Sequence, residues 1–182
     1  MTNSRNDPLD RFDTPDYATA QFLPVLARTV RPKTILEPAA GKGDMLRELR
    51  RQWPDARVDA FDVAPRDEGR EGIVQRGFFF DDEPGGYDLV ISNPPFSSIY
   101  EFVLHGLTKL NPGGVLAFLS PAAFFESKAR REFNRQRPPH HTYILPTRVS
   151  FTGDGNTDQR MLAWLVWREN GGRKYVSRLT VL

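Results

Sequence analysis

Short apolar runs alternate with stretches of helical pattern along most of this chain, and that alternation limits the possible folds more than any other feature. The apolar runs predict strands at residues 34–36, 57–61, 72–75, 88–92, 115–119, 142–145 and 161–167. The intervening stretches predict helices at residues 16–29, 45–52, 98–109 and 126–135. Strands separated by helices pair in parallel through right-handed crossovers, so we expect a sheet with helices on both faces.

The last predicted strand departs from this rule, because it follows a loop at residues 152–156 and no helix. A strand entered in this way can run antiparallel to its neighbours. The sequence therefore predicts a three-layer α/β fold with a mostly parallel, seven-stranded sheet and an antiparallel last strand. Residues 1–12 are polar, and we expect them to be flexible and residues 13–182 to form a single domain.

The composition excludes several classes of protein and site. The 182 residues include no cysteine, so disulfides and cysteine-bound metals are impossible. The chain has no run of eighteen apolar residues, and residues 1–7 lack the pattern of a secretory signal, so we expect a cytoplasmic protein. The histidines lack metal-ligand spacing with any acidic cluster, and we predict no metal site at His105, His140 and His141.

The formal net charge of +2 does not identify a partner, but the charges are unevenly distributed. Two acidic residues, Glu126 and Glu132, lie among six basic ones in the segment from 126 to 148, namely Lys128, Arg130, Arg131, Arg135, Arg137 and Arg148. Basic side chains in such a cluster can contact phosphates, and an ordinary solvated helix face is the alternative.

Two closely spaced glycines follow the first predicted strand, in the segment Glu37-Pro38-Ala39-Ala40-Gly41-Lys42-Gly43. Glycines here allow a tight turn and a close approach of the backbone to a ligand. A dinucleotide site would have a third glycine three residues after Gly43, where this chain has Leu46. An acid at Glu37 instead suits a cationic ligand, such as a sulfonium that also carries an ammonium group.

Asp62 ends the second predicted strand, about twenty residues after Gly43. An acid at this place can accept hydrogen bonds from ribose hydroxyls. Taken alone, the two glycines could form a simple turn and Asp62 could be solvated. Together with Glu37, the pattern predicts a site for a nucleoside-type cofactor.

The most specific feature is Asn93-Pro94-Pro95-Phe96, directly after the strand at residues 88–92. Two prolines cannot extend the strand, so they form a rigid loop whose carbonyl groups can face a ligand. The side-chain oxygen of Asn93 and the backbone oxygen of Pro94 could accept both N–H bonds of an adenine-type amino group. Phe96 offers a face for base stacking, although a strand-ending turn and a packed aromatic are the plainer alternatives.

At these residues the chain resembles the amino-methyltransferases of the class I S-adenosylmethionine-dependent superfamily. More narrowly, it resembles phage and prophage adenine-N6 DNA methyltransferases. The resemblance covers residues 12–167 and implies a Rossmann-like class I methyltransferase fold with S-adenosylmethionine as cofactor. The sulfonium is already a good leaving group, so the transfer needs no metal.

The resemblance also implies the roles of individual residues. Family members contact the cofactor with an N-terminal segment, matched here by residues 12–17, with the glycine motif and with the ribose-binding acid. The implied cofactor-binding residues are Thr14, Pro15, Glu37, Pro38, Ala39, Gly41, Gly43, Asp62 and Asn93. The implied catalytic residues are Asn93, Pro94, Pro95 and Phe96. A late loop at residues 150–158 is similar to one that packs beside the target base, which suggests Phe151 as a second aromatic there; a core or hinge role is the alternative.

Two departures from the family pattern matter. The third motif of the family places an Asp where this chain has Phe78, so either Asp81 contacts the cofactor's adenine or that base is held by stacking and backbone alone. Sequence-specific members also carry a separate target-recognition domain, which we do not expect in residues 168–182. The resemblance therefore implies short or relaxed sequence specificity, or help from a partner. The basic segment offers Lys128, Arg130 and Arg131 as candidate DNA contacts.

Three functions remain compatible with these residues. The first is methyl transfer to the N6 amino group of adenine in DNA, which the basic segment favours. The second is the same chemistry on RNA adenine or on a protein glutamine amide, since both present a planar NH2 group. The third is a catalytically idle module of the same fold that binds nucleic acid or a protein.

Overall fold

The computed structural model describes residue 14 and residues 16–65, 72–80, 85–146, 161–169 and 177–181. Within these residues, eight strands form one sheet in the order β3-β2-β1-β4-β5-β7-β6-β8. The strands are β1 Thr34–Glu37, β2 Arg57–Asp62, β3 Ile73–Gln75, β4 Tyr87–Ser92, β5 Leu110–Pro121, β6 His141–Ile144, β7 Leu162–Arg168 and β8 Arg178–Val181.

The first five strands pair in parallel, and β7 runs antiparallel to both of its neighbours, β5 and β6. The predicted α/β fold with a mostly parallel sheet and a late antiparallel strand is therefore confirmed. The predicted strand count is one too low, because β8 adds an eighth strand parallel to β6. All four residues of β8 are exposed, including the apolar side chains of Leu179 and Val181, so this short alternating strand contributes nothing to the core.

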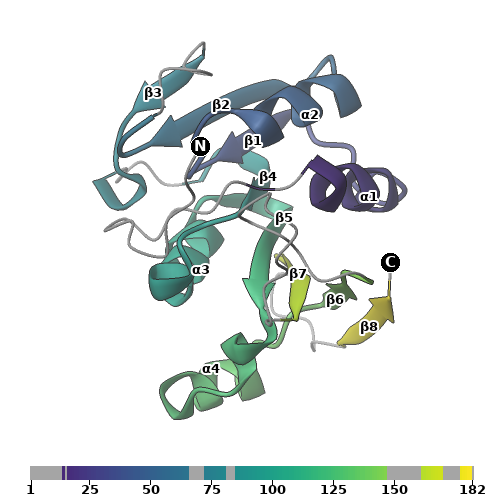
Figure 1. Cartoon of the computed structure of the whole chain (residues 1–182), viewed down its shortest axis with the longest axis vertical. Coiled ribbons are helices and arrows are strands. Elements are labelled where there is room, and N and C mark those ends of the chain that lie inside the picture. The colour runs from purple at the N-terminus through teal and green to yellow at the C-terminus, as the bar shows by residue number, and fades with distance from the viewer. Residues whose placement is uncertain are drawn as a thin grey trace, which may run out of the picture.

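Four α-helices accompany the sheet in the described residues: α1 Asp16–Leu26, α2 Asp44–Gln52, α3 Ile99–Thr108 and α4 Arg131–Gln136. Helices α1 and α2 cover one face and α3 covers the other (Figure 1). Along β5 the side chains alternate between the two layers: Val115 and Ala117 face α1 and α2, whereas Leu116 and Phe118 face α3. This two-residue period explains why β5 reads as a continuous apolar run in the sequence.

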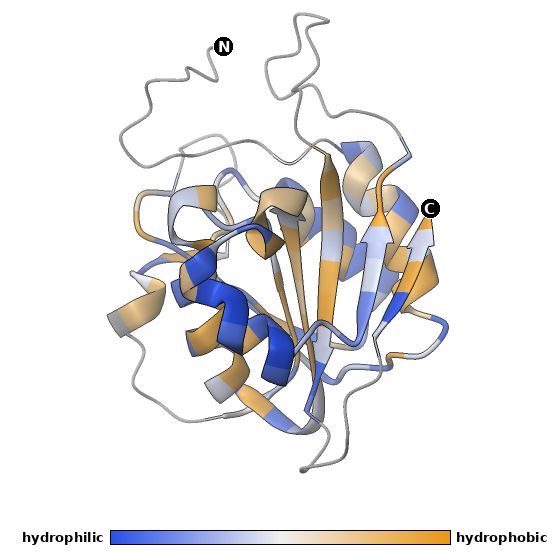
Figure 2. Cartoon of the chain, turned by 90° about the horizontal axis from the view of Figure 1, so that it is seen from below, coloured by the Kyte–Doolittle hydropathy of each residue, from blue (hydrophilic) through white to orange (hydrophobic). Residues whose placement is uncertain are grey.

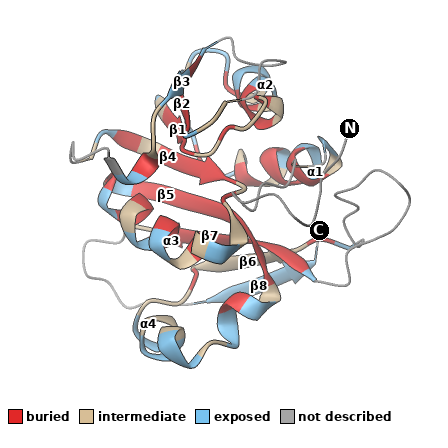
Figure 3. Cartoon of the chain, turned by 60° about the vertical axis from the view of Figure 1, so that its left-hand side comes forward, coloured by how far each residue is buried: buried red, intermediate tan, exposed pale blue. Residues whose placement is uncertain are grey.

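The central strands are the most buried part of the molecule. Figure 2 shows them as the most hydrophobic, and Figure 3 shows β4 and β5 buried while β8 is exposed. On the α1 face, Phe22 stacks on Trp164 with ring centroids 4.4 Å apart. The indole N–H of Trp164 donates to the backbone oxygen of Ala18 at 3.1 Å, which anchors α1 to β7.

Two predicted helices differ from the observed ones. Helix α1 ends at Leu26 rather than at Thr29. The amides of Arg28 and Thr29 donate to the carbonyls three residues back, not four as in an α-helix. The predicted helix at residues 126–135 begins later, at Arg131, after two short 3-10 turns, Ala122–Phe125 and Lys128–Arg130. No helix in the described part of the chain is long and apolar enough to cross a membrane.

Candidate functional site

The carboxyl ends of three neighbouring parallel strands bring the predicted site residues together. Glu37 ends β1, Asp62 ends β2 on one side of it, and Asn93 follows β4 on the other. Strand order reverses between β1 and β4, since the chain moves outward to β3 from one and to β5 from the other. Open α/β sheets bind their ligands at such a point.

The loop after β1 has the backbone shape that its glycines predict. Gly41 and Gly43 have φ angles of 56° and 84°, in the left-handed region that side chains disfavour. The Gly43 amide donates to the Ala40 oxygen at 2.8 Å, and α2 starts at the next residue. A Cβ atom added to Gly41 would meet nothing within 4 Å, so the space beside this residue is open.

Asp62 holds the glycine loop against the end of β2. Its carboxylate oxygens accept hydrogen bonds from the backbone N–H of Gly41 at 2.7 Å and of Ala64 at 2.8 Å. The side chain is buried, and a second bond from the Ala40 amide to the Phe61 oxygen runs beside it at 2.9 Å. The loop is therefore fixed to β2 at two successive residues.

Glu37 is a buried acid with an unsatisfied oxygen. It is 2% exposed, and its Oε2 atom has no hydrogen-bond partner among the described residues. Burial, followed by repulsion from Asp62 and Asp44, raises the pKa of Glu37 well above its usual value, although Arg50 lowers it. A ligand that brings a positive charge or a hydrogen-bond donor to this oxygen would relieve both penalties.

The Asn-Pro-Pro-Phe segment forms the loop between β4 and α3. The side-chain oxygen of Asn93 is buried, Pro94 is buried, and Pro95 is extended with φ −53° and ψ 128°. Phe96 is half-buried and packs against the core under α1. This contact supports the packing alternative for Phe96, and it leaves part of the ring exposed.

A residue that the sequence did not single out connects the two loops. The Ser92 hydroxyl, at the end of β4, donates to the Ala39 carbonyl in the glycine loop at 3.5 Å. Ser92 is fully buried, and its position directly before Asn93 is the signal that could have indicated this role. This long contact brings the start of the loop that carries Asn93 beside the loop that carries Gly41.

Phe78, which occupies the place of the family's third-motif Asp, lies in the core. Phe78 is 3% exposed and packs against Phe102 at 5.3 Å and His105 at 4.6 Å between ring centroids. The next residue, Phe79, is 44% exposed and contacts the same two rings. Of the predicted cofactor contacts outside these loops, Thr14 is half-buried, whereas Pro15 and Asp81 lie outside the described residues. Phe151, predicted to lie beside the target base, is also outside them.

The basic segment after β5 contains cations of two kinds. Arg130 donates to the backbone oxygens of Phe124 at 2.9 Å and Ala123 at 3.3 Å, and its guanidinium lies 5.0 Å from the centre of the Phe124 ring. Within the part of the chain that is described, the side chains of Lys128 and Arg131 have no hydrogen bond or ion pair. Arg130 therefore shapes the segment, while Lys128 and Arg131 project from it.

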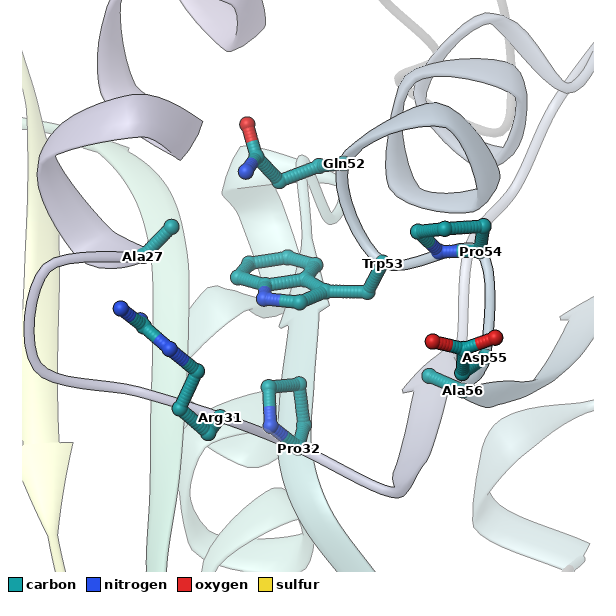
Figure 4. A pocket seen from close by; sticks show the side chains of 8 residues that line it. All are labelled: Ala27, Arg31, Pro32, Gln52, Trp53, Pro54, Asp55 and Ala56. Carbon is teal, nitrogen blue, oxygen red and sulfur yellow. The ribbon is translucent and has the colours of Figure 1, made fainter.

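One pocket of about 440 Å³ lies away from these loops, near the ends of α1 and α2 and the starts of β1 and β2 (Figure 4). It is lined by Ala27, Arg31, Pro32, Gln52, Trp53, Pro54, Asp55 and Ala56. These residues sit at the amino end of the parallel strands, so the pocket is separate from the site at Glu37, Asp62 and Asn93. No group of three or more potential metal ligands occurs among the described residues.

Comparison with known proteins finds relatives of this chain. One relative, the type II methyltransferase M.CvrRI of Paramecium bursaria Chlorella virus XZ-6E, is 28% identical in an alignment of length 122 that covers 53% of this chain and 32% of the relative. The chain thus spans about a third of the length of that curated protein.

Two solved structures have the same fold. A putative class I S-adenosylmethionine-dependent methyltransferase from Listeria monocytogenes superposes with a TM-score of 0.69 at 18% identity, over 98% of this chain and 68% of that one. The methyltransferase subunit of a type I restriction-modification system from Streptococcus thermophilus superposes with a TM-score of 0.65 at 18% identity, over 87% and 45% of the two chains. A family model described as a methyltransferase domain matches residues 11–181, and the chain therefore belongs to the methyltransferase-domain family.

Proposed function

We propose that this methyltransferase transfers the methyl group of S-adenosylmethionine to the exocyclic N6 amino group of adenine in DNA. The observation that carries this proposal is the Asn93-Pro94-Pro95-Phe96 loop at the end of β4, which lies beside the glycine loop because β4 pairs in parallel with β1. An acceptor site and a cofactor site in contact are what methyl transfer requires.

S-adenosylmethionine is the cofactor, and it supplies a methyl group bonded to a positively charged sulfur. The unsatisfied oxygen of Glu37 suits its ammonium group, and the open space beside Gly41 suits a ligand that lies against the loop. Asp62 would accept bonds from the ribose hydroxyls with the lone pairs that its two backbone donors leave available. Phe79 and Val63 offer exposed apolar surface for the adenine ring of the cofactor at the same end of the sheet. This surface would take over the role of the third-motif Asp, which is Phe78 in this chain.

At the acceptor side, Asn93 and Pro94 would hold the adenine amino group. The Asn93 side-chain oxygen and the Pro94 backbone oxygen accept its two N–H bonds, which favours localisation of the nitrogen lone pair toward the methyl donor. The nitrogen attacks as a neutral group and becomes acidic only once it carries the methyl group. A strong general base is therefore unnecessary, and these residues act by positioning and by hydrogen bonding.

DNA is the preferred acceptor for two reasons. Lys128 and Arg131 project from the segment that follows β5, the strand next to β4, so they lie on the acceptor side of the site. The relatives above include a type II methyltransferase and a restriction-modification subunit. RNA adenine and a protein glutamine amide present the same NH2 geometry to Asn93 and would be separated by experiment.

The test offers the protein methyl-labelled S-adenosylmethionine and, in parallel, unmethylated duplex DNA, RNA and a protein extract. We expect label in DNA. Label confined to RNA or protein would keep the chemistry at Asn93 and overturn the choice of acceptor. Cofactor binding without label in any acceptor would favour the idle module.

A further inference from the structure

Two large apolar side chains are exposed at the carboxyl end of β5. Phe125 is 42% exposed and Met161 is 52% exposed, whereas the preceding Phe124 is 2% exposed and belongs to the core. The Ala122 amide donates to the Met161 oxygen at 2.9 Å, which joins the start of the 3-10 turn to the residue before β7. Side chains three residues apart eclipse in a 3-10 helix, so Phe125 lies on the same side of the turn as Ala122.

The charges around this apolar surface favour a polyanion. Lys128 and Arg131 follow Phe125 closely, are exposed, and form no ion pair with a described residue. Glu126 is the acid of this turn, while Glu132 is paired with Arg135. The Arg130 side chain donates to the backbone oxygens of Ala123 and Phe124, which stabilises the turn that carries Phe125.

The turn also stands close to the acceptor loop. Ser92, the last residue of β4, pairs in register with Phe118 of β5. Strand β5 continues to Pro121, which carries the chain roughly 10 Å further at about 3.3 Å per residue. Phe125 therefore stands beyond the Asn93 loop, at the end of the sheet from which a polymeric acceptor must approach.

We propose that Phe125, supported by Met161, inserts into the base stack of duplex DNA next to the adenine that is being methylated. This inference rests on the proposed function. An adenine cannot reach Asn93 while it is stacked in a duplex, and moving it out leaves a gap that an apolar side chain can fill. Lys128 and Arg131 would hold the phosphates on either side of that gap.

The test compares Phe125→Ala with the wild type on one unmethylated plasmid DNA, used as duplex and after heat denaturation. Unstacking costs a few kcal/mol in a duplex and much less in a single strand. We expect kcat/KM on the duplex to fall roughly tenfold or more, and by a much smaller factor on the denatured DNA. Phe125→Leu keeps a wedge-sized side chain and should recover most of the duplex activity.

Leu104→Ala is the matched control, because Leu104 is also 42% exposed but lies on α3. It should leave both activities within about twofold of wild type. The proposed insertion of Phe125 would be overturned if Phe125→Ala lost kcat/KM equally on both DNA forms, or lost none on either. It would also be overturned if the wild type methylated only denatured DNA. A wild type that labels no DNA at all would instead overturn the proposed function itself, so the two failures are distinguishable.

Discussion

The carboxylate of Asp62 accepts a hydrogen bond from the backbone N–H of Gly41 at 2.7 Å. Asp62 ends β2 and Gly41 lies in the loop that follows the neighbouring β1, so the bond fixes the glycine loop before any ligand binds. A loop that is already in its binding conformation loses less entropy on binding. This bond therefore makes Asp62 both a candidate ribose ligand and the residue that positions Gly41.

Replacing Asp62 by alanine should remove both roles at once. We expect S-adenosylmethionine affinity to fall by about tenfold to a hundredfold, the equivalent of one or two hydrogen bonds to a charged group. Isothermal titration calorimetry measures this directly. Asp55→Ala, at the far end of the sheet, is the control and should bind normally. Equal affinities for Asp62→Ala and wild type would remove Asp62 from the cofactor site.

Glu37→Gln should raise stability and lower cofactor affinity. Folding raises the pKa of Glu37, so its contribution to stability is fully present below the usual value of 4.5 and is lost as pH rises through the raised folded value. Glutamine removes this loss, and the cofactor-free variant should melt at a higher temperature at neutral pH. The same change removes the negative charge from the ammonium site. A lower melting temperature together with unchanged affinity would contradict this role.

Asp88 has the opposite dependence on pH. Burial alone would raise the pKa of Asp88, but hydrogen bonds from Asn111 and from the amides of Lys33 and Thr34 outweigh it and hold the pKa below 3.8. This stability is present above the usual pKa and is lost as pH falls through the lowered value.

Asp88→Ala should therefore destabilise the protein by about 1–3 kcal/mol at neutral pH, because three donors at the amino ends of β1 and β5 lose their acceptor. Urea unfolding at pH 7 and at pH 3 measures the effect, which should shrink at the lower pH. Cofactor affinity should stay unchanged, since Asp88 lies at the other end of β4 from Asn93. A destabilisation that is independent of pH would show that the charge is irrelevant.

The double variant Lys128→Gln and Arg131→Gln should weaken DNA binding and flatten its dependence on salt. Losing two phosphate contacts should lower the slope of log affinity against log salt by roughly two. Fluorescence anisotropy with a labelled duplex at several salt concentrations gives the slope. Arg51→Gln on α2, whose charge is paired with Glu48, is the control. An unchanged slope in the double variant would return the segment to an ordinary solvated surface.

The sequence predicted the fold, and it predicted that the candidate site residues lie at the same end of the sheet, for a physical reason. Strands such as Leu89–Ile91 and Val115–Leu119 are buried on both faces, so their apolar runs are unbroken. Parallel strands place their carboxyl ends at one edge, which brings Glu37, Asp62 and Asn93 together without any knowledge of distances.

Features set by tertiary contacts were beyond the sequence. Nothing in the pattern around Arg130 shows that its side chain binds the backbone of Phe124, or that 3-10 turns stand where the helix was expected to begin. Strand β8 has four residues, and its apolar Leu179 and Val181 are exposed, so it adds no buried run that a sequence pattern could reveal. The burial of Phe78 depends on Phe102 and His105, which belong to a helix that follows later in the chain.

The central claim is that Asn93 and Pro94 hold the N6 amino group of adenine, and nucleoside analysis of methylated DNA tests it most directly. Unmethylated duplex DNA is treated with the wild type or with Asn93→Ala, digested to nucleosides and analysed by mass spectrometry. The account predicts N6-methyladenosine as its deoxynucleoside from the wild type, and a loss of about a hundredfold to a thousandfold in kcat for the variant with nearly unchanged cofactor affinity. A methyl group on another base, or undiminished turnover by Asn93→Ala, would contradict it.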